Sequence, residues 1–259
     1  MTFVRVEDVG PVRHVIISRA EKRNALSSEV YAELGEAFST AADAVDVRCV
    51  IVRGDGPMFS AGNDVRELAA LTADPTGVRR IRPIMLGAIN ALEEMAKPAV
   101  AQIHGACIGG AMELVLACDL RVMAADATMG LFETKLGLIP DLGGSSRLPA
   151  IVGLGRAKEI VMTARTVAAD EALRIGLVNR VAAPDGLDAA TAELVGELLA
   201  NAPLALGHAK RLLDAAAKPA LAATLEMELA AQETLAGTED FAAGVRAVVE
   251  RRPATFTAR

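Results

Sequence analysis

The sequence contains no tryptophan, and aromatic residues make up only 3% of its 259 residues. Hydrophobic residues nevertheless account for 52% of the chain, so we expect a core of aliphatic side chains and closely packed helices. No stretch reaches the roughly 18 consecutive apolar residues that a membrane span needs. The first ten residues also lack the basic and apolar segments of a secretory signal. We therefore expect a cytoplasmic protein of one large domain or two small ones.

Cysteine and histidine are equally scarce, with 3 residues of each. Cys49, Cys107 and Cys118 follow neither a zinc-ligand nor a redox spacing, and the histidines are scattered singly. We expect buried free thiols and no metal site. Cys107 stands in a glycine-rich segment, but no histidine motif follows it that would support a cysteine nucleophile.

Excess positive charge is also lacking, because 27 lysines and arginines face 33 aspartates and glutamates, for a net charge of −6. Such a chain has no general attraction for a nucleic-acid backbone. We expect neither nucleic acid nor membrane as a partner. The sequence RAEKR at 19–23 forms a local basic cluster that could hold a phosphorylated small molecule.

Strand and helix signals alternate through the N-terminal half of the chain. We expect strands at 11–19, 49–54, 98–105 and 119–125, and helices that begin at Ser27 or Ser28 and that span Pro83 to Lys97. This alternation favours βαβ units around a parallel sheet. After about residue 145 the composition and periodicity are helical, and no long linker or repeat divides the chain. The pattern predicts one α/β core followed by a helical C-terminal segment.

Two loops rich in small residues, at 59–65 and 103–120, each follow a predicted strand. Ala61 and Gly62 in the first loop, and Gly110 in the second, offer backbone N–H groups to a ligand. A helix starting near Gly110 leaves its first N–H groups unpaired and adds positive potential there. Either loop alone is typical of an ordinary turn. Two donors from separate loops are what an oxyanion hole needs.

Three carboxylates accompany these loops. Glu113 stands among apolar residues, so burial should raise its pKa toward the range useful for proton transfer. Glu133 also has apolar neighbours, although pairing with Lys135 in a solvated loop is the alternative. Asp141 lies in a Pro-Asp-x-Gly-Gly turn, where a turn-forming role is the stronger interpretation.

Six segments then bear on the family of the chain: RNALS (23–27), FSAGND (59–64), residues 97–122, residues 133–149, AADEALRIGLVNRV (168–181) and residues 238–256. In this order they resemble the crotonase family, also called the enoyl-CoA hydratase/isomerase superfamily. The resemblance implies a crotonase-like (ClpP/crotonase) α/β fold of repeated ββα units, with a core at 1–195. It also implies a C-terminal helical region at 196–259 that caps the site and makes trimer contacts, with two trimers usually pairing as a hexamer.

Residue by residue, the resemblance assigns the oxyanion-hole amides to Ala61 and Gly110 and the two catalytic carboxylates to Glu113 and Glu133. It implies a coenzyme A path lined by Arg23, Ala25, Ala61, Gly62, Asn63, Asp64, Val65 and Gly110. It implies no cofactor besides the coenzyme A that arrives as part of the substrate.

The reaction expected from this resemblance is the addition of water across the 2,3 double bond of trans-2-enoyl-CoA. Ionised Glu113 would take a proton from water, and protonated Glu133 would deliver one to the α-carbon. Two departures keep other reactions open. Phe132 stands where hydratases of the family usually have proline, and Asp141 replaces a usual glycine. An acid at that position shuttles protons in some family isomerases, so the alternatives are an enoyl-CoA or dienoyl-CoA isomerase using Glu133 or Asp141, and a non-catalytic acyl-CoA-binding member.

Overall fold

The structure, a computed structural model, describes residues 2–258 and contains a six-stranded sheet in the order β1-β2-β3-β4-β6-β9. Its strands are β1 (Val4–Val9), β2 (Val12–Ile17), β3 (Cys49–Gly54), β4 (Ala99–Ile103), β6 (Leu120–Ala124) and β9 (Arg180–Ala182). Only β1 and β2 pair antiparallel; the other neighbours are parallel. The strands β3 and β4 are buried along nearly their whole length, as the continuous apolar runs of the sequence predict.

A smaller sheet orders β5 (Ala106–Ile108), β7 (Thr128–Gly130) and β8 (Val167–Ala168). Because β4 leads directly into β5 and then into helix α4 (Gly110–Leu116), the chain forms a ββα unit there. The strands β1 and β2 followed by α1 (Ser28–Asp43) form another. These are ββα units of the kind that the family resemblance implies, and one of them brings the start of α4 next to the small sheet.

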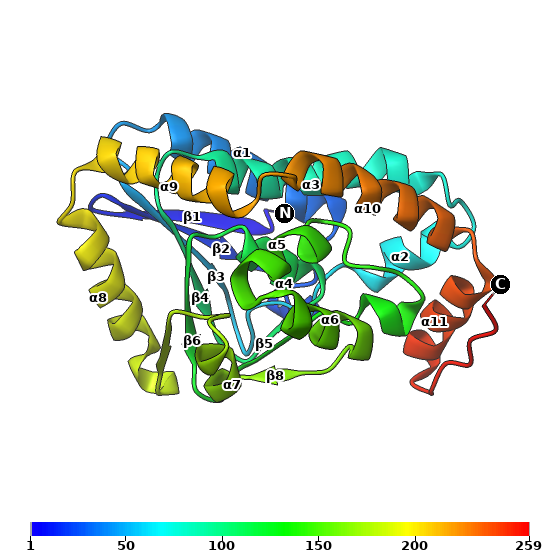
Figure 1. Ribbon diagram of the computed structural model, residues 1–259. Coiled ribbons are helices and arrows are strands. Elements are labelled where there is room, and N and C mark those ends of the chain that lie inside the picture. Colours follow the sequence, from blue (N-terminus) through cyan, green and yellow to red (C-terminus); the bar gives the residue numbers. More distant parts are fainter. Residues whose placement is uncertain (1, 259) are drawn as a thin grey trace.

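Helices α1 and α3 (Gly77–Glu94) pack against each other beside the large sheet (Figure 1). The Ser27 side chain caps α1 by accepting from the Val30 amide, as expected. The start expected for α3 at Pro83 is wrong, since the helix begins at Gly77. Its first turns bury Val78 and Arg82, and Pro83 removes only one backbone hydrogen bond from a helix held by that burial.

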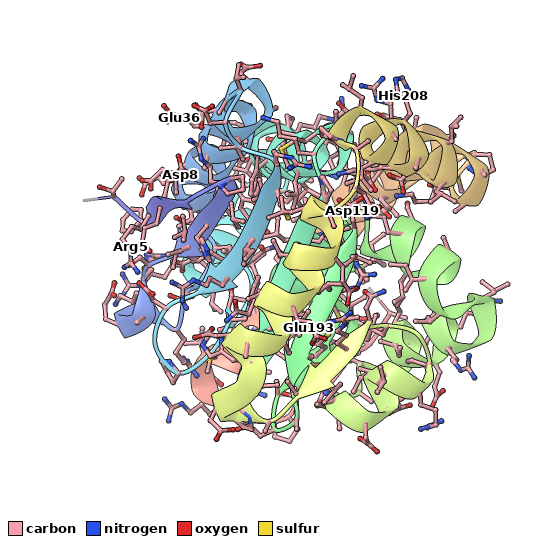
Figure 2. The ribbon with its side chains drawn as sticks, turned by 90° about the vertical axis from the view of Figure 1, so that its left-hand side faces the viewer. Arg5, Asp8, Glu36, Asp119, Glu193 and His208 are labelled. Carbon is pink, nitrogen blue, oxygen red and sulfur yellow. The ribbon has the colours of Figure 1, made fainter. Side chains whose placement is uncertain are left out.

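Helix α8 (Leu187–Leu199) packs on β4 and β6, and Figure 2 shows it lying across the face of the sheet. The boundary expected between residues 195 and 196 falls inside this helix. A division there would cut a continuous element, because the hydrophobic face that packs on the sheet extends through Leu194 and Val195.

The chain ends in α9 (Pro203–Ala217), α10 (Leu221–Ala236) and α11 (Glu239–Glu250), with α11 at the opposite end of the molecule from α8 (Figure 1). The α9 side chain of Lys210 reaches the carboxylate of Asp119 at 2.9 Å, below α9 in Figure 2. Helix α10 packs on α3 and on α5 (Gly144–Val152), and α11 packs on α2 (Val65–Leu71) and on η2 (Glu133–Leu136). The C-terminal helices therefore reach the segments that carry the predicted site.

The remaining elements are α2 (Val65–Leu71), α5 (Gly144–Val152), α6 (Leu154–Thr163), α7 (Ala169–Arg174) and the short 3-10 helices η1 (Ala20–Lys22), η2 (Glu133–Leu136) and η3 (Pro184–Gly186). Within residues 2–258, no helix combines the length and apolar character needed to cross a bilayer.

Candidate active site

A cavity of about 230 Å³ lies between segments that are far apart in the sequence. Its wall is formed by the loop at 61–65, the start of α4, the segment from 132 to 141, and side chains of α10 and α11. Apart from its polar groups, the wall is lined by the Phe132 ring and by aliphatic side chains such as Leu136 and Val245. An apolar cavity with a few convergent polar groups is the usual form of a small-molecule site.

One side of this cavity, here called the amide wall, consists of the backbone N–H groups of Asn63 and Gly110. Neither amide has a hydrogen-bond acceptor among residues 2–258. Gly110 is the first residue of α4, where helix geometry leaves the amide unpaired. The two segments touch, because a Cβ on Gly62 would lie 3.6 Å from the Gly110 nitrogen. Two unpaired amides at one cavity wall can hold an oxygen that gains negative charge.

The prediction that Ala61 supplies an oxyanion-hole amide is wrong, because the Ala61 N–H donates to the Arg23 carbonyl at 3.0 Å. The backbone alternation expected of an extended chain breaks at Gly62, which has a φ of 89°. The Gly62 carbonyl accepts from the Leu26 amide at 2.8 Å and the Asp64 amide donates to the Leu26 carbonyl at 2.9 Å, which leaves the intervening Asn63 amide without an acceptor among the described residues. The donor therefore lies two residues beyond the predicted position.

The side chain of Asn63 is fixed beside the second amide. Its Oδ1 accepts a hydrogen bond from the Tyr31 hydroxyl at 2.9 Å. A Cβ added to Gly110 would stand 2.1 Å from this Oδ1 and 2.7 Å from the Tyr31 oxygen. Because no side chain fits in that space, glycine at position 110 allows the two amides to approach each other.

The same cavity is lined by Glu133 and Asp141, which together with the buried Glu113 form what we call the acid wall. Glu113 is only 1% exposed and does not line the cavity itself. Its Oε1 accepts from the amides of Leu142 at 2.7 Å and Gly144 at 2.9 Å. Its Oε2 is buried without a partner among the described residues, as is Oε2 of Glu133.

Burial governs the protonation of these acids. It raises the pKa of Glu133 to about 8. Burial, followed by the charges of Glu133 and Asp141, raises the pKa of Glu113 well above its ordinary value, while the Gly144 amide opposes that rise. The alternative of a solvated Glu133 paired with Lys135 is contradicted, because Glu133 is buried and Lys135 instead stands over the Phe132 ring, 4.5 Å from its centroid.

Asp141 does more than form a turn. Its side chain is buried, and its Oδ1 accepts from Gln232 Nε2 at 3.0 Å. Its Oδ2 lies 3.2 Å from Nε of the buried Arg82. Burial raises the pKa of Asp141 to about 7, and the Arg82 charge opposes that rise. The turn therefore presents an acid that changes protonation near neutral pH.

The residues expected along the coenzyme A path divide into two groups. Ala61, Gly62, Asn63, Val65 and Gly110 line the cavity, whereas Arg23, Ala25 and Asp64 do not. Arg23 supports the loop through its carbonyl, and Asp64 caps α2 while pairing with Arg19 at 2.9 Å. Among residues 2–258, no cluster of histidine, cysteine and acidic side chains is arranged to hold a metal ion.

Sequence reasoning missed the Asn63 amide as an oxyanion donor, and it missed Gln232 and Tyr31 altogether. Gln232 is 91 residues away from Asp141 along the chain. No motif surrounds it in the helix LAATLEMELAAQETLA. Only the packing of α10 on the loop makes it part of the site.

Comparison with known proteins gives consistent results. The family model described as enoyl-CoA hydratase/isomerase matches residues 9–259. A mitochondrial methylglutaconyl-CoA hydratase from Mus musculus is 34% identical, with 98% of this chain and 85% of the relative covered. A mitochondrial Delta(3,5)-Delta(2,4)-dienoyl-CoA isomerase from Homo sapiens is 36% identical, with 93% and 77% covered.

Among solved structures, an enoyl-CoA hydratase from Mycobacterium avium subsp. paratuberculosis superposes with a TM-score of 0.90 at 29% identity. The match covers 99% of each chain. These findings confirm the fold class predicted from the sequence, and the chain belongs to the enoyl-CoA hydratase/isomerase family.

Proposed function

We propose that the protein hydrates trans-2-enoyl-CoA thioesters. The observation that carries this proposal is the pair of unpartnered oxygens, Oε2 of Glu113 and Oε2 of Glu133, on two buried carboxyls. A buried polar atom without a partner is destabilising and uncommon in folded proteins. Two such atoms near one cavity fit a pair of groups that exchange protons with water and substrate.

The amide wall supplies the electrophilic half of the reaction. The thioester carbonyl oxygen would accept from the amides of Asn63 and Gly110, which stabilise the enolate formed when water attacks the β-carbon. Removal of one such donor costs roughly 3–4 kcal/mol of transition-state stabilisation in enzymes that use them. Both donors are backbone groups, so the wall needs no charged side chain.

The acid wall supplies the proton transfers. Glu113 takes a proton from the attacking water and must be ionised for this step. Its two amide donors favour that form, against the burial and the neighbouring carboxylates that raise its pKa. Glu133, with a pKa raised to about 8, is protonated at neutral pH and gives its proton to the α-carbon. One proton is thus gained and one lost, and exchange with solvent restores the starting state.

A second candidate is an isomerase that moves a double bond within a 3-enoyl-CoA or dienoyl-CoA. The observation in its favour is that Asp141 and Glu133 line the cavity whereas Glu113 does not. In this reaction Asp141 removes a proton from one carbon and Glu133 delivers a proton to another. The relatives include both a hydratase and an isomerase, so both reactions belong in one experiment.

The test follows the absorbance of the conjugated enoyl thioester. Hydration of crotonyl-CoA predicts loss of that absorbance, and Glu113→Gln and Glu133→Gln should each slow it at least about 100-fold. Isomerisation predicts that a 3-enoyl-CoA gains the absorbance and that Asp141→Asn slows this most. Glu193→Gln, on the exposed side of α8, is the matched control (Figure 2). Binding of both esters without turnover would instead support the non-catalytic alternative.

We further propose that the chain works as a homotrimer or as a pair of trimers. The support is apolar surface on the C-terminal helices: Leu204, Leu212 and Leu213 of α9 and Met227 of α10 are each at least 69% exposed. Apolar side chains gathered on a helix surface favour burial by a partner. Sedimentation equilibrium would test this, and a monomer at micromolar concentration would contradict it.

A further inference from the structure

Gln232 of α10 is a buried polar side chain that makes hydrogen bonds on both sides of its carboxamide. Its Oε1 accepts from the Ile139 amide at 3.3 Å, and its Nε2 donates to Asp141 Oδ1 at 3.0 Å. A backbone N–H can only donate, so the carboxamide oxygen must face Ile139. The NH₂ group is therefore directed at the Asp141 carboxyl, and the amide cannot turn over without losing both bonds.

Two contacts hold the Asp141 side chain, one on each oxygen. Gln232 Nε2 donates to Oδ1, and the Arg82 guanidinium of α3 forms an ion pair with Oδ2, 3.2 Å from its Nε, while that Nε–H donates to the Asp141 backbone carbonyl at 2.9 Å. The other titratable groups facing this region oppose a negative charge on Asp141. They are the carboxyls of Glu228 from α10, Glu113 from α4 and Glu133 from η2, whereas Tyr31 of α1, whose pKa burial raises well above its usual value, stays neutral. In such surroundings, loss of either the Gln232 hydrogen bond or the Arg82 ion pair should strongly favour the protonated carboxyl.

Helix α10 also holds the rest of the same loop. One turn before Gln232, Glu228 accepts from the Gly143 amide at 2.9 Å and from the Ser146 hydroxyl. The intervening amides of Leu142 and Gly144 are the donors to Glu113. One face of α10 thus determines where the loop places both Asp141 and the donors to Glu113.

We propose that Gln232 is a positioning residue, which directs the Asp141 carboxyl into the cavity wall and favours its ionised form. Through this contact, the C-terminal helical region sets the acid–base state of the site as well as covering it. The effect on turnover rests on the isomerase candidate of the proposed function, because only in that reaction does Asp141 take part in proton transfer. The effect on Asp141 itself does not depend on any reaction.

The direct test is a carbon-13 NMR titration of the protein labelled at aspartate carboxyls, with Asp141→Asn identifying the signal. Gln232→Met keeps the side-chain volume but removes the donor, and should raise the Asp141 pKa by about one unit. Gln232→Glu keeps an acceptor for Ile139 but adds a negative charge, and should raise it further. Glu226→Met, on the exposed side of α10, should leave it unchanged.

Circular dichroism first establishes that each variant is folded. The order Gln232→Glu above Gln232→Met above wild type supports the proposal, because a purely structural role gives no such dependence on charge. An Asp141 signal with the same pKa in all folded variants would overturn it. A shift in the predicted order in a protein that turns over neither ester would uphold this proposal while contradicting the proposed function.

Discussion

The amide wall and the acid wall face the same cavity but are built by different means. The amides of Asn63 and Gly110 are backbone groups whose positions follow from the pairing of strands and loops. The Asp141 side chain instead depends on contacts with α3 and α10, and Glu133 lies in η2, on which α11 packs. The first wall is insensitive to pH, and the second has two carboxyls that titrate at about 8 and 7.

The two walls should therefore respond differently to mutation. A buried carboxyl with a raised pKa destabilises the folded state at any pH where it must ionise. An unpaired amide at a helix start carries no such pH-dependent cost. On the acid wall, a substitution that removes a buried carboxyl should lower activity and raise the free energy of unfolding. Substitutions at four positions can test this difference between the two walls.

The largest effect is expected at Gly110. In Gly110→Ala the new Cβ would fall 2.1 Å from Asn63 Oδ1, so Asn63 must move and the paired amides separate. We expect kcat to drop by about 100-fold or more, as after loss of an oxyanion donor. The measurement is steady-state turnover of whichever ester the wild type accepts. An unchanged kcat would show that these amides do not bind the reacting oxygen.

Glu133→Gln should lose activity yet gain stability, a combination that is expected on the acid wall and not on the amide wall. The folded pKa of about 8 lies above the unfolded value, so between about pH 4.5 and 8 the folded state holds a proton that the unfolded state releases. Wild-type stability accordingly falls as pH rises through this window. Glutamine removes the effect, and we expect a gain on the order of 3 kcal/mol at pH 8 and little at pH 4.5.

Urea unfolding at these two pH values measures the gain. Glu36→Gln is the matched control, because Glu36 lies on the exposed side of α1 in Figure 2. A gain in Glu133→Gln that is equal at both pH values would contradict the assigned cause.

Asn24 provides a side-chain support behind the amide wall. Its fully buried carboxamide donates to the carbonyls of Asp55, Met58 and Phe59 at 2.7, 2.9 and 3.1 Å, and its Oδ1 accepts from the Arg19 amide. Asn24→Ala leaves several of these groups unpaired, and we expect a loss of about 2–3 kcal/mol in the free energy of unfolding. Chemical denaturation measures this loss. A loss that does not change with pH would show that it does not involve titration of the carboxyls in the acid wall.

The smallest effect is expected at a site distant from both walls. Gly196 is exposed within α8, and a Cβ there would meet nothing within 4 Å. Gly196→Ala should stabilise the protein by about 0.5–1 kcal/mol through helix propensity. Its kcat should equal that of the wild type. A change in kcat would show that α8 influences the cavity, and would contradict the expectation that only the two walls control turnover.

Much of the core was predictable from the sequence because buried strands have strong apolar patterns. β2, β3, β4 and β6 all lie within the predicted ranges. No strand was predicted at β1, because this edge strand buries only Val4 and exposes its other side chains. Its VRVEDV sequence therefore contains little hydrophobic signal.

The site divides in the same way. Glu113, Glu133 and Gly110 lie in motifs that could be recognised from the sequence. The Asn63 amide could not be assigned, because its direction depends on the Gly62 torsion rather than on a side chain. Gln232 could not be assigned either, since α10 has polar residues on several faces and only packing shows which one turns inward.

The conformation of Gly62 has a consequence for how this loop can change. Its φ of 89° is one that side-chain-bearing residues rarely adopt, and a Cβ there would lie 2.5 Å from the Ile108 carbonyl oxygen. Libraries randomised at this codon should return almost exclusively glycine among active clones. Substrate range can be engineered through the neighbouring side chains, but the backbone conformation at Gly62, which positions the Asn63 amide, does not tolerate another residue.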